Sequence, residues 1–331
     1  MVTIKFNSSF LCYIMKVIEF SKPGIENIEV TERNLGGEGI KVRVVKAGLN
    51  PLDYNLIDGK VVYNVHPMPH IPGSEVMGIA TEDGKTIKKG DRVIVYNRIF
   101  DNSCEMCYSG NEHLCYNGGI WGVISNGGYS EYIRIGEQNL FKVPDSMDDN
   151  TAVSVGIGAL TSYRALKLAN PLVNEKILIY GAGNTGIFTV QIAKHMGLDV
   201  YVYSRNKNLE SSGIKVYDAV PEYFHADIII NPLGGKLFSD SLKHLKRKGR
   251  IITYGVLTGK IADMDIANIY TNELKIIGST GGTRKDLSEL LALMETKHFD
   301  LPIYKEFSLW GIKEALHAFR DRVNGRIILN L

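Results

Sequence analysis

Three of the four cysteines in this chain of 331 residues lie within twelve positions, at Cys104, Cys107 and Cys115. Asp101 stands three residues before the first of them. One carboxylate and three thiolates at these spacings can surround a Zn²⁺ ion tetrahedrally, so we predict these four residues as its ligands. Because four protein ligands leave no position for water or substrate, the predicted zinc is structural. His113 is the alternative to Asp101, and a metal-free cluster of buried thiols is the alternative to the whole site.

A second chemical pattern is the glycine-rich run Gly181-Ala-Gly-Asn-Thr-Gly186. A strand is expected before it at 176–180, and a helix after it at 186–196. In that context the first glycine permits a tight turn, the second lets the backbone approach a pyrophosphate, and the third lets helix and strand pack closely. The alternative is a merely glycine-rich turn. The predicted dinucleotide contacts are Gly181, Gly183, Asn184, Thr185 and Gly186.

The next expected strand, at 199–203, is followed by Ser204-Arg205-Asn206-Lys207. Enzymes that use NAD place a carboxylate there to hold the ribose 2′-hydroxyl, and this chain has none. The hydroxyl of Ser204 and the cations of Arg205 and Lys207 suit a 2′-phosphate instead. We therefore predict NADP(H) as the cofactor, with a solvated loop as the alternative interpretation.

The pattern of apolar residues along the chain predicts an α/β protein with two kinds of sheet. Up to about residue 143, short apolar or alternating runs at 41–45, 76–80, 92–96 and 129–135 indicate mostly antiparallel strands. Beyond Pro144, a helix at 151–168 precedes alternating strands and helices, which indicate a parallel sheet. The further elements expected are strands at 226–230, 249–254, 274–278 and 325–331 and helices at 236–246, 285–297 and 311–322.

Composition excludes several function classes. Hydrophobic residues make up 44% and charged residues 22%, as in ordinary globular proteins. The formal net charge is +2 with no basic cluster, so nucleic acid is not expected as a partner. The apolar run at 10–14 is far too short to span a membrane, and no secretory signal is apparent. Few cysteines favour a reducing compartment, the cytoplasm. Met15 is the expected start, leaving residues 1–14, with Cys12, as an extension.

Taken together, these motifs resemble the medium-chain dehydrogenases and reductases, the superfamily of zinc-containing alcohol dehydrogenases and quinone oxidoreductases. The resemblance implies a GroES-like, β-rich catalytic domain of residues 15–150 with 280–331, and a Rossmann NADP(H)-binding domain of residues 151–279. It also implies Thr161 beside the nicotinamide, Arg326 at the pyrophosphate, and a homodimer or homotetramer, often paired through a strand such as 274–278. The other motifs that carry it are Ala47-Gly-Leu-Asn-Pro-Leu-Asp53, Pro72-Gly-Ser-Glu75, Gly127-Gly-Tyr-Ser-Glu-Tyr132 and Leu160-Thr-Ser-Tyr-Arg164.

Alcohol dehydrogenases of this superfamily hold a second, catalytic zinc, and the resemblance locates its three ligand positions at Asn50, Ser74 and Ile157. An amide and a hydroxyl are poor zinc ligands and an alkyl side chain is none, so we predict no catalytic metal. Leu52 likewise stands where a hydroxyl residue would relay the alcohol proton. A site rebuilt with His70 is the alternative.

Without zinc, an isolated carbonyl accepts hydride poorly, because the charge that develops on its oxygen is not stabilised. A quinone or an α,β-unsaturated carbonyl delocalises that charge, so we predict such a small-molecule acceptor. Asn50 and Tyr54 are predicted to orient it, Tyr63 to lie on the loop over the cleft, and a tyrosine or water to supply the proton. The alternatives are an alcohol or polyol dehydrogenase with a rebuilt zinc site and a non-catalytic NADPH-binding protein.

Overall fold

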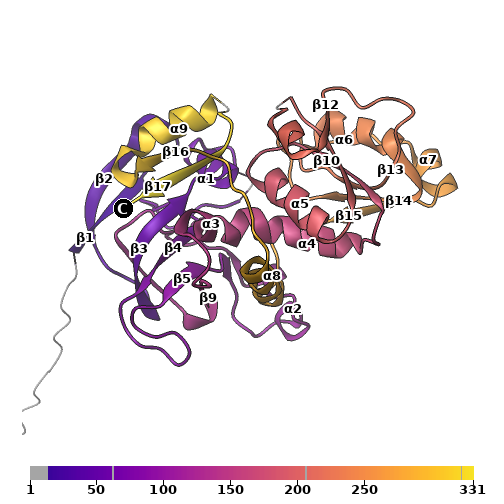
Figure 1. Ribbon diagram of the computed structural model, residues 1–331. Helices are drawn as coiled ribbons and strands as arrows, with labels where there is room; N and C mark the ends of the chain where they lie inside the picture. Colours follow the sequence, from indigo (N-terminus) through magenta and orange to yellow (C-terminus); the bar gives the residue numbers. More distant parts are fainter. Residues whose placement is uncertain (1–13, 62, 206, 322) are drawn as a thin grey trace, which may run out of the picture.

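The computed structural model describes residues 14–331, except residues 62, 206 and 322. Two lobes lie side by side, each built on one large sheet (Figure 1). The N-terminal and C-terminal parts of the chain together form the mixed-sheet lobe on the left, and the middle of the chain forms the parallel-sheet lobe on the right. The predictions about an N-terminal extension and Cys12 concern residues 1–13, which lie outside the described part.

The mixed-sheet lobe contains a seven-stranded sheet in the order β16-β17-β3-β4-β5-β9, with β8 paired to β3. All of its pairs are antiparallel except β16 with β17, which agrees with the predicted antiparallel character. Its strands are β3 (Ile40–Gly48), β4 (Val76–Ala80), β5 (Arg92–Val95), β8 (Tyr132–Ile135), β9 (Leu140–Lys142), β16 (Ile303–Ser308) and β17 (Arg326–Asn330).

Two small antiparallel pairs and several short helices complete this lobe. The pairs are β1 (Ile14–Phe20) with β2 (Ile28–Asn34) and β6 (Arg98–Ile99) with β7 (Gly119–Ile120). The α-helices are α1 (Pro51–Ile57), α2 (Glu105–Tyr108), α8 (Arg284–Thr296) and α9 (Ile312–Arg320). Single 3₁₀ turns occupy Ile25–Asn27, Glu112–Leu114, Glu137–Asn139 and Leu309–Gly311.

The parallel-sheet lobe contains six parallel strands in the order β12-β11-β10-β13-β14-β15. This is the strand order of a doubly wound dinucleotide-binding sheet, and it confirms the predicted fold class. Because helices cover both faces of such a sheet, its central strands β10 and β13 are apolar over most of their length. The strands are β10 (Lys176–Tyr180), β11 (Asp199–Tyr203), β12 (Lys215–Tyr217), β13 (Ala226–Ile230), β14 (Leu245–Thr253) and β15 (Lys275–Gly278).

The helices of this lobe are α4 (Leu160–Ala169), α5 (Asn184–His195), α6 (Gly235–Ser241) and α7 (Ile266–Thr271), with 3₁₀ turns at Asn208–Ser212 and Leu242–His244. In the described part of the chain, no helix is long and apolar enough to cross a membrane.

The segment that joins the two lobes corrects the prediction of one helix at 151–168. It consists of α3 (Asp149–Val153), a π-helical turn (Val155–Ala159) and then α4. A π turn inserts one extra residue into a helix, and such turns are frequent at functional sites. Apolar spacing did not show the insertion, since the residues on both sides of it are buried. The turn presents the N–H groups of Ile157 and Gly158 to the side chain of Glu75.

Two other predicted elements were wrong in extent. The helix expected at 236–246 ends at Ser241, followed by one 3₁₀ turn, because β14 already begins at Leu245 and bulges where Lys248 adopts a left-handed φ of 60°. The strand expected at 129–135 begins only at Tyr132, since the N–H groups of residues 127–129 bond to the carbonyls of residues 71–73. Strands β2, β6, β7, β9, β12 and β16 and helices α1, α2 and α7 were not predicted.

The two lobes share one apolar core. A single buried cluster extends from Ile94 and Tyr96 in the mixed-sheet lobe through Val155 and Leu160 to Ile179 in the centre of the parallel sheet. A second cluster fills the rest of the mixed-sheet lobe, and a third covers the other face of the parallel sheet. The segment α3–α4 therefore packs against the apolar residues of both lobes, and this packing fixes the position of one lobe relative to the other.

Candidate functional site

The buried carboxylate of Glu75, the residue before β4, joins three distant segments of the chain. The side chain is 1% exposed. Its Oε2 accepts from Asn50 Nδ2 at 2.9 Å and from the guanidinium of Arg326, while its Oε1 accepts the N–H groups of Ile157 and Gly158 at 2.6 and 3.2 Å. These bonds satisfy the carboxylate on both oxygens, as burial of a charge requires.

Asn50 is engaged at both ends of its amide. Besides the bond from Nδ2 to Glu75, its Oδ1 accepts from Arg326 Nη1 at 2.9 Å. Asn50 is also the N-cap of α1, in a capping box in which its N–H donates to Asp53 Oδ2 at 3.0 Å. The side chain is thereby fixed in one orientation and is 2% exposed.

The three positions at which the resemblance located catalytic zinc ligands do converge in space. Asn50 and Ile157 both bond to Glu75, and Ser74 precedes it in the chain. Ser74 is fully buried, and its Oγ has no hydrogen-bond partner among the described residues. An amide held in two hydrogen bonds, a hydroxyl and an alkyl side chain do not fit a zinc ligand set.

His70, the alternative ligand, lies in a different environment. The ring is fully buried, and its Nε2 lies 2.9 Å from the carbonyl oxygen of Gly122. Burial lowers the pKa of His70, so the imidazole is neutral near pH 7. Among the described residues it belongs to no group of three or more side chains able to hold a metal.

The ion pair of Arg326 with Glu75 explains a glycine in the sequence motif 47–53. A Cβ atom on Gly48 would lie 2.0 Å from Arg326 Nη2 and 2.5 Å from Glu75 Oε2, so only glycine leaves room for the pair. The guanidinium is 1% exposed and also bonds to Asn50. A role of Arg326 at the pyrophosphate stays a prediction.

Asp53 is a second buried carboxylate at this site. It is fully buried and accepts the N–H groups of Asn50 and Ser74, each at 3.0 Å. Burial raises the pKa of Asp53 to about 6, although both hydrogen bonds favour the ionised form. Burial and the charge of Asp53 raise the pKa of Tyr129, so this phenol stays protonated.

The two predicted catalytic tyrosines lie apart from the Glu75 cluster. The ring of Tyr54 stacks on Phe319 of α9 at 5.3 Å and lines a surface hollow with Lys60 and Lys313. Its contacts give the predicted role in orienting substrate no support. Tyr63 lies on the loop after α1 and is 46% exposed.

The glycine turn has the geometry that its sequence predicts. Gly181 adopts a left-handed φ of 97°, and a Cβ on Gly186 would lie 2.1 Å from the carbonyl oxygen of Gly181. No atom lies within 4 Å of the place where a Cβ would stand on Gly183, so the backbone is open to a ligand there. Helix α5 begins at Asn184, and its first residues, Thr185 among them, direct free N–H groups toward this opening. These residues fit a dinucleotide pyrophosphate.

The other predicted cofactor residues surround this turn. Thr161 is half-buried as the second residue of α4. Ser204, Arg205 and Lys207 follow β11, and Lys207 Nζ lies 3.6 Å from Asp218 Oδ2 in an exposed ion pair. The chemistry of these residues fits a 2′-phosphate, but their contacts to a cofactor stay a prediction.

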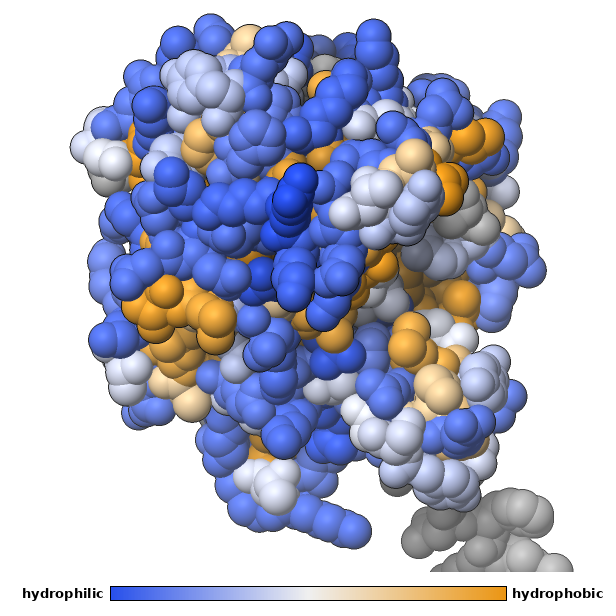
Figure 2. All heavy atoms as spheres, turned by 90° about the vertical axis from the view of Figure 1, so that its right-hand side faces the viewer, coloured by the Kyte–Doolittle hydropathy of each residue, from blue (hydrophilic) through white to orange (hydrophobic). Residues whose placement is uncertain are grey.

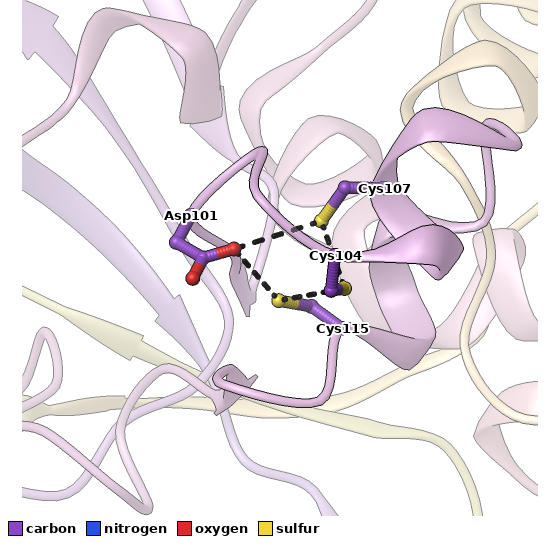
Figure 3. Close-up of side chains that lie close together, drawn as sticks. All are labelled: Asp101, Cys104, Cys107 and Cys115. Carbon is purple, nitrogen blue, oxygen red and sulfur yellow. Dashed lines mark hydrogen bonds between the residues drawn. The ribbon is translucent and has the colours of Figure 1, made fainter.

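The predicted structural zinc ligands do come together, in the cysteine loop (residues 101–115). One ligand atom of each of Asp101, Cys104, Cys107 and Cys115 lies within 4.8 Å of the others (Figure 3). Cys104 Sγ is 3.6 Å from Cys107 Sγ and 3.8 Å from Cys115 Sγ, too far for a disulfide. A tetrahedron with Zn–S bonds of 2.3 Å has edges of about 3.8 Å, so the spacing fits zinc.

The pKa shifts in the cysteine loop differ from one predicted ligand to the next. Hydrogen bonds from Ser103 lower the pKa of Asp101, so it is ionised, and backbone N–H groups lower the pKa of Cys104 to about 7. Burial raises the pKa of Cys115 to about 11. His113 is buried on the 3₁₀ turn outside this group, and burial with two nearby arginines lowers its pKa to about 4.

Three residues that bond to the segment between β15 and α8, or to the start of α8, were not singled out from the sequence. Tyr96 donates through its hydroxyl to the carbonyl oxygen of Gly282 at 2.9 Å and to Glu112 Oε1 at 3.2 Å. Glu112 also accepts the N–H of Arg284, the first residue of α8, at 2.6 Å. Arg98 bonds to Thr280 Oγ1 at 3.1 Å. Their only signal in the sequence was position next to the cysteine loop.

Comparison with known proteins agrees with this arrangement. Residues 36–145 match the family described as "Alcohol dehydrogenase GroES-like domain", and residues 185–296 match "Zinc-binding dehydrogenase". A thermostable alcohol dehydrogenase from Pyrobaculum aerophilum has 33% identity and a TM-score of 0.89, covering 96% of this chain and all of that chain. An alcohol dehydrogenase of Geobacillus stearothermophilus is 29% identical over 95% of this chain and 98% of its own length. An acryloyl-coenzyme A reductase of Sulfurisphaera tokodaii is 28% identical over 92% and 96%.

Replacing Cys107 with serine should empty the metal site. Elemental mass spectrometry is expected to find one zinc per chain in the wild type and less than a tenth of that in Cys107→Ser, with a lower Tm because the loop loses its cross-link. Cys12→Ser is the control and should keep its zinc. A wild type without zinc, or a Cys107→Ser variant that retains it, would contradict the assignment.

Asp53 should make stability fall as pH rises from 4 to 7. Its pKa in the folded protein, about 6, exceeds the ordinary value of 3.8, so the folded state binds the proton more tightly and loses that advantage as pH passes 6. Relative to wild type, Asp53→Asn should gain about 3 kcal/mol of unfolding free energy over this range, measured by urea titration. For the control Asp263→Asn, at an exposed position, the unfolding free energy should vary with pH as in the wild type. If the unfolding free energy of Asp53→Asn also varies with pH as in the wild type, the prediction is wrong.

Proposed function

The chain belongs to the superfamily of zinc-containing alcohol dehydrogenases, the medium-chain dehydrogenases and reductases, and on this basis we propose that it reduces a conjugated carbonyl compound with NADPH and without a catalytic zinc. It is an oxidoreductase of the alcohol dehydrogenase type, of a family that uses zinc and a nicotinamide cofactor. The acceptor class, the preference for NADPH and the purely structural role of zinc are the proposal.

One observation carries the proposal: Glu75 and Arg326 occupy the amide of Asn50 where a zinc ligand would be needed. The amide donates to the carboxylate at 2.9 Å and accepts from the guanidinium at 2.9 Å. The other two ligand positions hold Ser74 and Ile157. No thiolate or imidazole is available at these three positions, so the reaction must proceed without a metal there.

The chemistry follows from the missing positive charge. Dihydronicotinamide, when bound, supplies a hydride, and the electron pair displaced in the acceptor must be stabilised as charge develops. In a conjugated acceptor that charge moves away from the carbon that receives the hydride and onto an oxygen that ordinary donors can reach. Leu52, in place of a hydroxyl residue, leaves no relay for an alcohol proton on this segment. Both features favour reduction of a conjugated acceptor over oxidation of an alcohol.

A relative supports this acceptor class. Acryloyl-coenzyme A, named in the relative from Sulfurisphaera tokodaii, is an α,β-unsaturated thioester, and the similarity spans nearly the whole length of both chains. The alcohol dehydrogenases among the relatives represent the alternative activity. The residues at the ligand positions support the conjugated acceptor over the alcohol.

The loop after β11 supports NADPH. Arg205 is exposed and within reach of the cofactor edge of the sheet, and no carboxylate lies in residues 204–207 to repel a 2′-phosphate. The nearby Asp218 forms an exposed ion pair with Lys207 at 3.6 Å, which is worth little in water and leaves that cation free to turn to a phosphate.

We also expect a homodimer or homotetramer, a small-molecule substrate and neither nucleic acid nor membrane as partner. Strand β15 is an open edge of the parallel sheet. Exposed apolar side chains lie on this strand and on the segment before it. Figure 2 faces this side of the molecule, where separate hydrophobic patches interrupt a mostly hydrophilic surface. Light scattering tests the expectation, and a monomer would contradict it. The exposed residues are Val256, Leu257, Ile261, Met264, Ile266, Tyr270 and Ile276.

Arg205→Ala should weaken NADPH binding selectively. Loss of a charge-assisted pair with the 2′-phosphate is expected to raise the Kd of NADPH about 10- to 100-fold and leave that of NADH unchanged, measured by calorimetry. Arg247→Ala, an exposed arginine away from this loop, is the matched control. An equal effect on both cofactors, or none, would overturn the assignment.

The acceptor class is tested by a substrate panel. With NADPH we expect turnover of at least one of 1,4-benzoquinone, 3-buten-2-one and acryloyl-coenzyme A, at one zinc per chain, and no oxidation of ethanol or benzyl alcohol with NADP⁺. Alcohol oxidation together with a second bound zinc would establish a rebuilt metal site instead. NADPH binding without turnover of any acceptor would show a non-catalytic protein.

A further inference from the structure

Arg98 is a buried cation that the proposed function does not yet use. It lies on β6, three residues before the cysteine loop, and is 9% exposed. Its guanidinium rests against backbone, because a Cβ on Gly281 would lie 2.5 Å from Nη2. Arginine stays protonated in proteins, so this side chain brings a full positive charge into the interior.

That charge has no carboxylate partner. Nη2 donates to Thr280 Oγ1 at 3.1 Å, Nε has no hydrogen-bond partner, and among the described residues no carboxylate oxygen lies within 4.0 Å. The nearby Glu112 is occupied by Tyr96 and by the N–H of Arg284. Burial of an unpaired charge is costly, and a buried group without its partners calls for an explanation such as a ligand.

Arg98 lies where the mixed-sheet lobe meets the segment between β15 and α8, which contains Thr280 and Gly281. On one side it touches Gly281, and a Cβ on the next residue, Gly282, would press on Leu160, the neighbour of Thr161. On the other side the carbonyl oxygen of Asn97 accepts the N–H of Trp121 at 3.0 Å.

The residue after Trp121 completes this second wall. A Cβ on Gly122 would lie 2.8 Å from Ser74 Oγ, the buried hydroxyl at a vacant ligand position. Arg98 is thereby linked through Thr280, Gly281 and Gly282 to Leu160, and through Asn97 and the segment Trp121–Gly122 to Ser74.

We propose that Arg98 donates a hydrogen bond to the carbonyl oxygen of the conjugated acceptor and stabilises the negative charge that forms there. This rests on the proposed function. The hydride forms a C–H bond at the β carbon, the C=C electron pair moves to the α–carbonyl bond, and the carbonyl pair ends on oxygen as an enolate. A proton from water then joins the α carbon, and the C=O bond is restored. Arg98 keeps its own proton throughout.

The charge of Arg98 is suited to this step because it is in place before the reaction. A donor held in a water-excluded site needs no reorganisation when the oxyanion forms, and removal of one such donor typically lowers kcat about 10²- to 10³-fold. A zinc ion would supply the same electrostatic stabilisation. Three positions that hold zinc ligands in the zinc enzymes carry other side chains here, while the buried guanidinium of Arg98 has no carboxylate partner among the described residues.

Kinetics of Arg98 variants test the proposal on whichever acceptor the wild type reduces. Arg98→Gln should lower kcat about 100-fold with less than a threefold change in KM. Arg98→Lys keeps the charge, so its kcat should lie between that of the wild type and that of Arg98→Gln. Arg134→Gln, at a half-buried arginine that pairs with Glu82 in the same lobe, should keep wild-type kcat. Unchanged kcat in Arg98→Gln, or a rise in KM alone, would overturn the proposal.

A second measurement separates this proposal from a structural role and from the acceptor class. Butanoate, whose carboxylate mimics the enolate oxygen, is titrated into the complex with NADP⁺ by calorimetry. Arg98→Gln should weaken its binding at least tenfold at an unchanged Kd of NADP⁺, and Arg134→Gln should not. Equal butanoate binding in both variants would refute the anion site. If the wild type reduces no acceptor, the proposed function fails while this binding result still decides the role of Arg98.

Discussion

The buried carboxylate of Glu75 is the contact on which the geometry of this protein depends. It collects donors from the loop before α1, from the π turn between the lobes and from β17 near the end of the chain. Because both partners are 1% exposed, removal of Arg326 or Glu75 alone would leave a buried charge, which typically costs about 3–5 kcal/mol. One side chain thereby holds the first helix, the joint and the last strand in register.

The same contact decides which chemistry is available. In zinc enzymes of this superfamily the ligand positions around this glutamate carry side chains that bind metal. Here the amide of Asn50 is tied to Glu75 and Arg326, whose charges balance each other. The unbalanced positive charge of the joint lies instead on Arg98, which faces the Rossmann side through Thr280.

The cysteine loop is coupled to this joint. Glu112, on the 3₁₀ turn inside the loop, bonds to Tyr96 of the adjoining mixed-sheet lobe and to the first N–H of α8. Figure 1 shows α2 and α8 close together at this place. The cysteine loop is thereby joined through Glu112 to the start of α8, and Thr280, in the segment before α8, accepts a hydrogen bond from Arg98.

From the sequence alone, the two sheets, the glycine turn and the cluster of Asp101 with three cysteines could be predicted, because each depends on spacing within a few residues. Tertiary structure decided the π turn at 155–159, the direction of Tyr54 toward α9 and the isolation of Arg98. These features arise from contacts between distant residues, such as Glu75 with Ile157, 82 positions apart, and Arg98 with Thr280, 182 apart. Local patterns carry no information on such pairs, since which residues meet is determined only when both lobes have folded against each other.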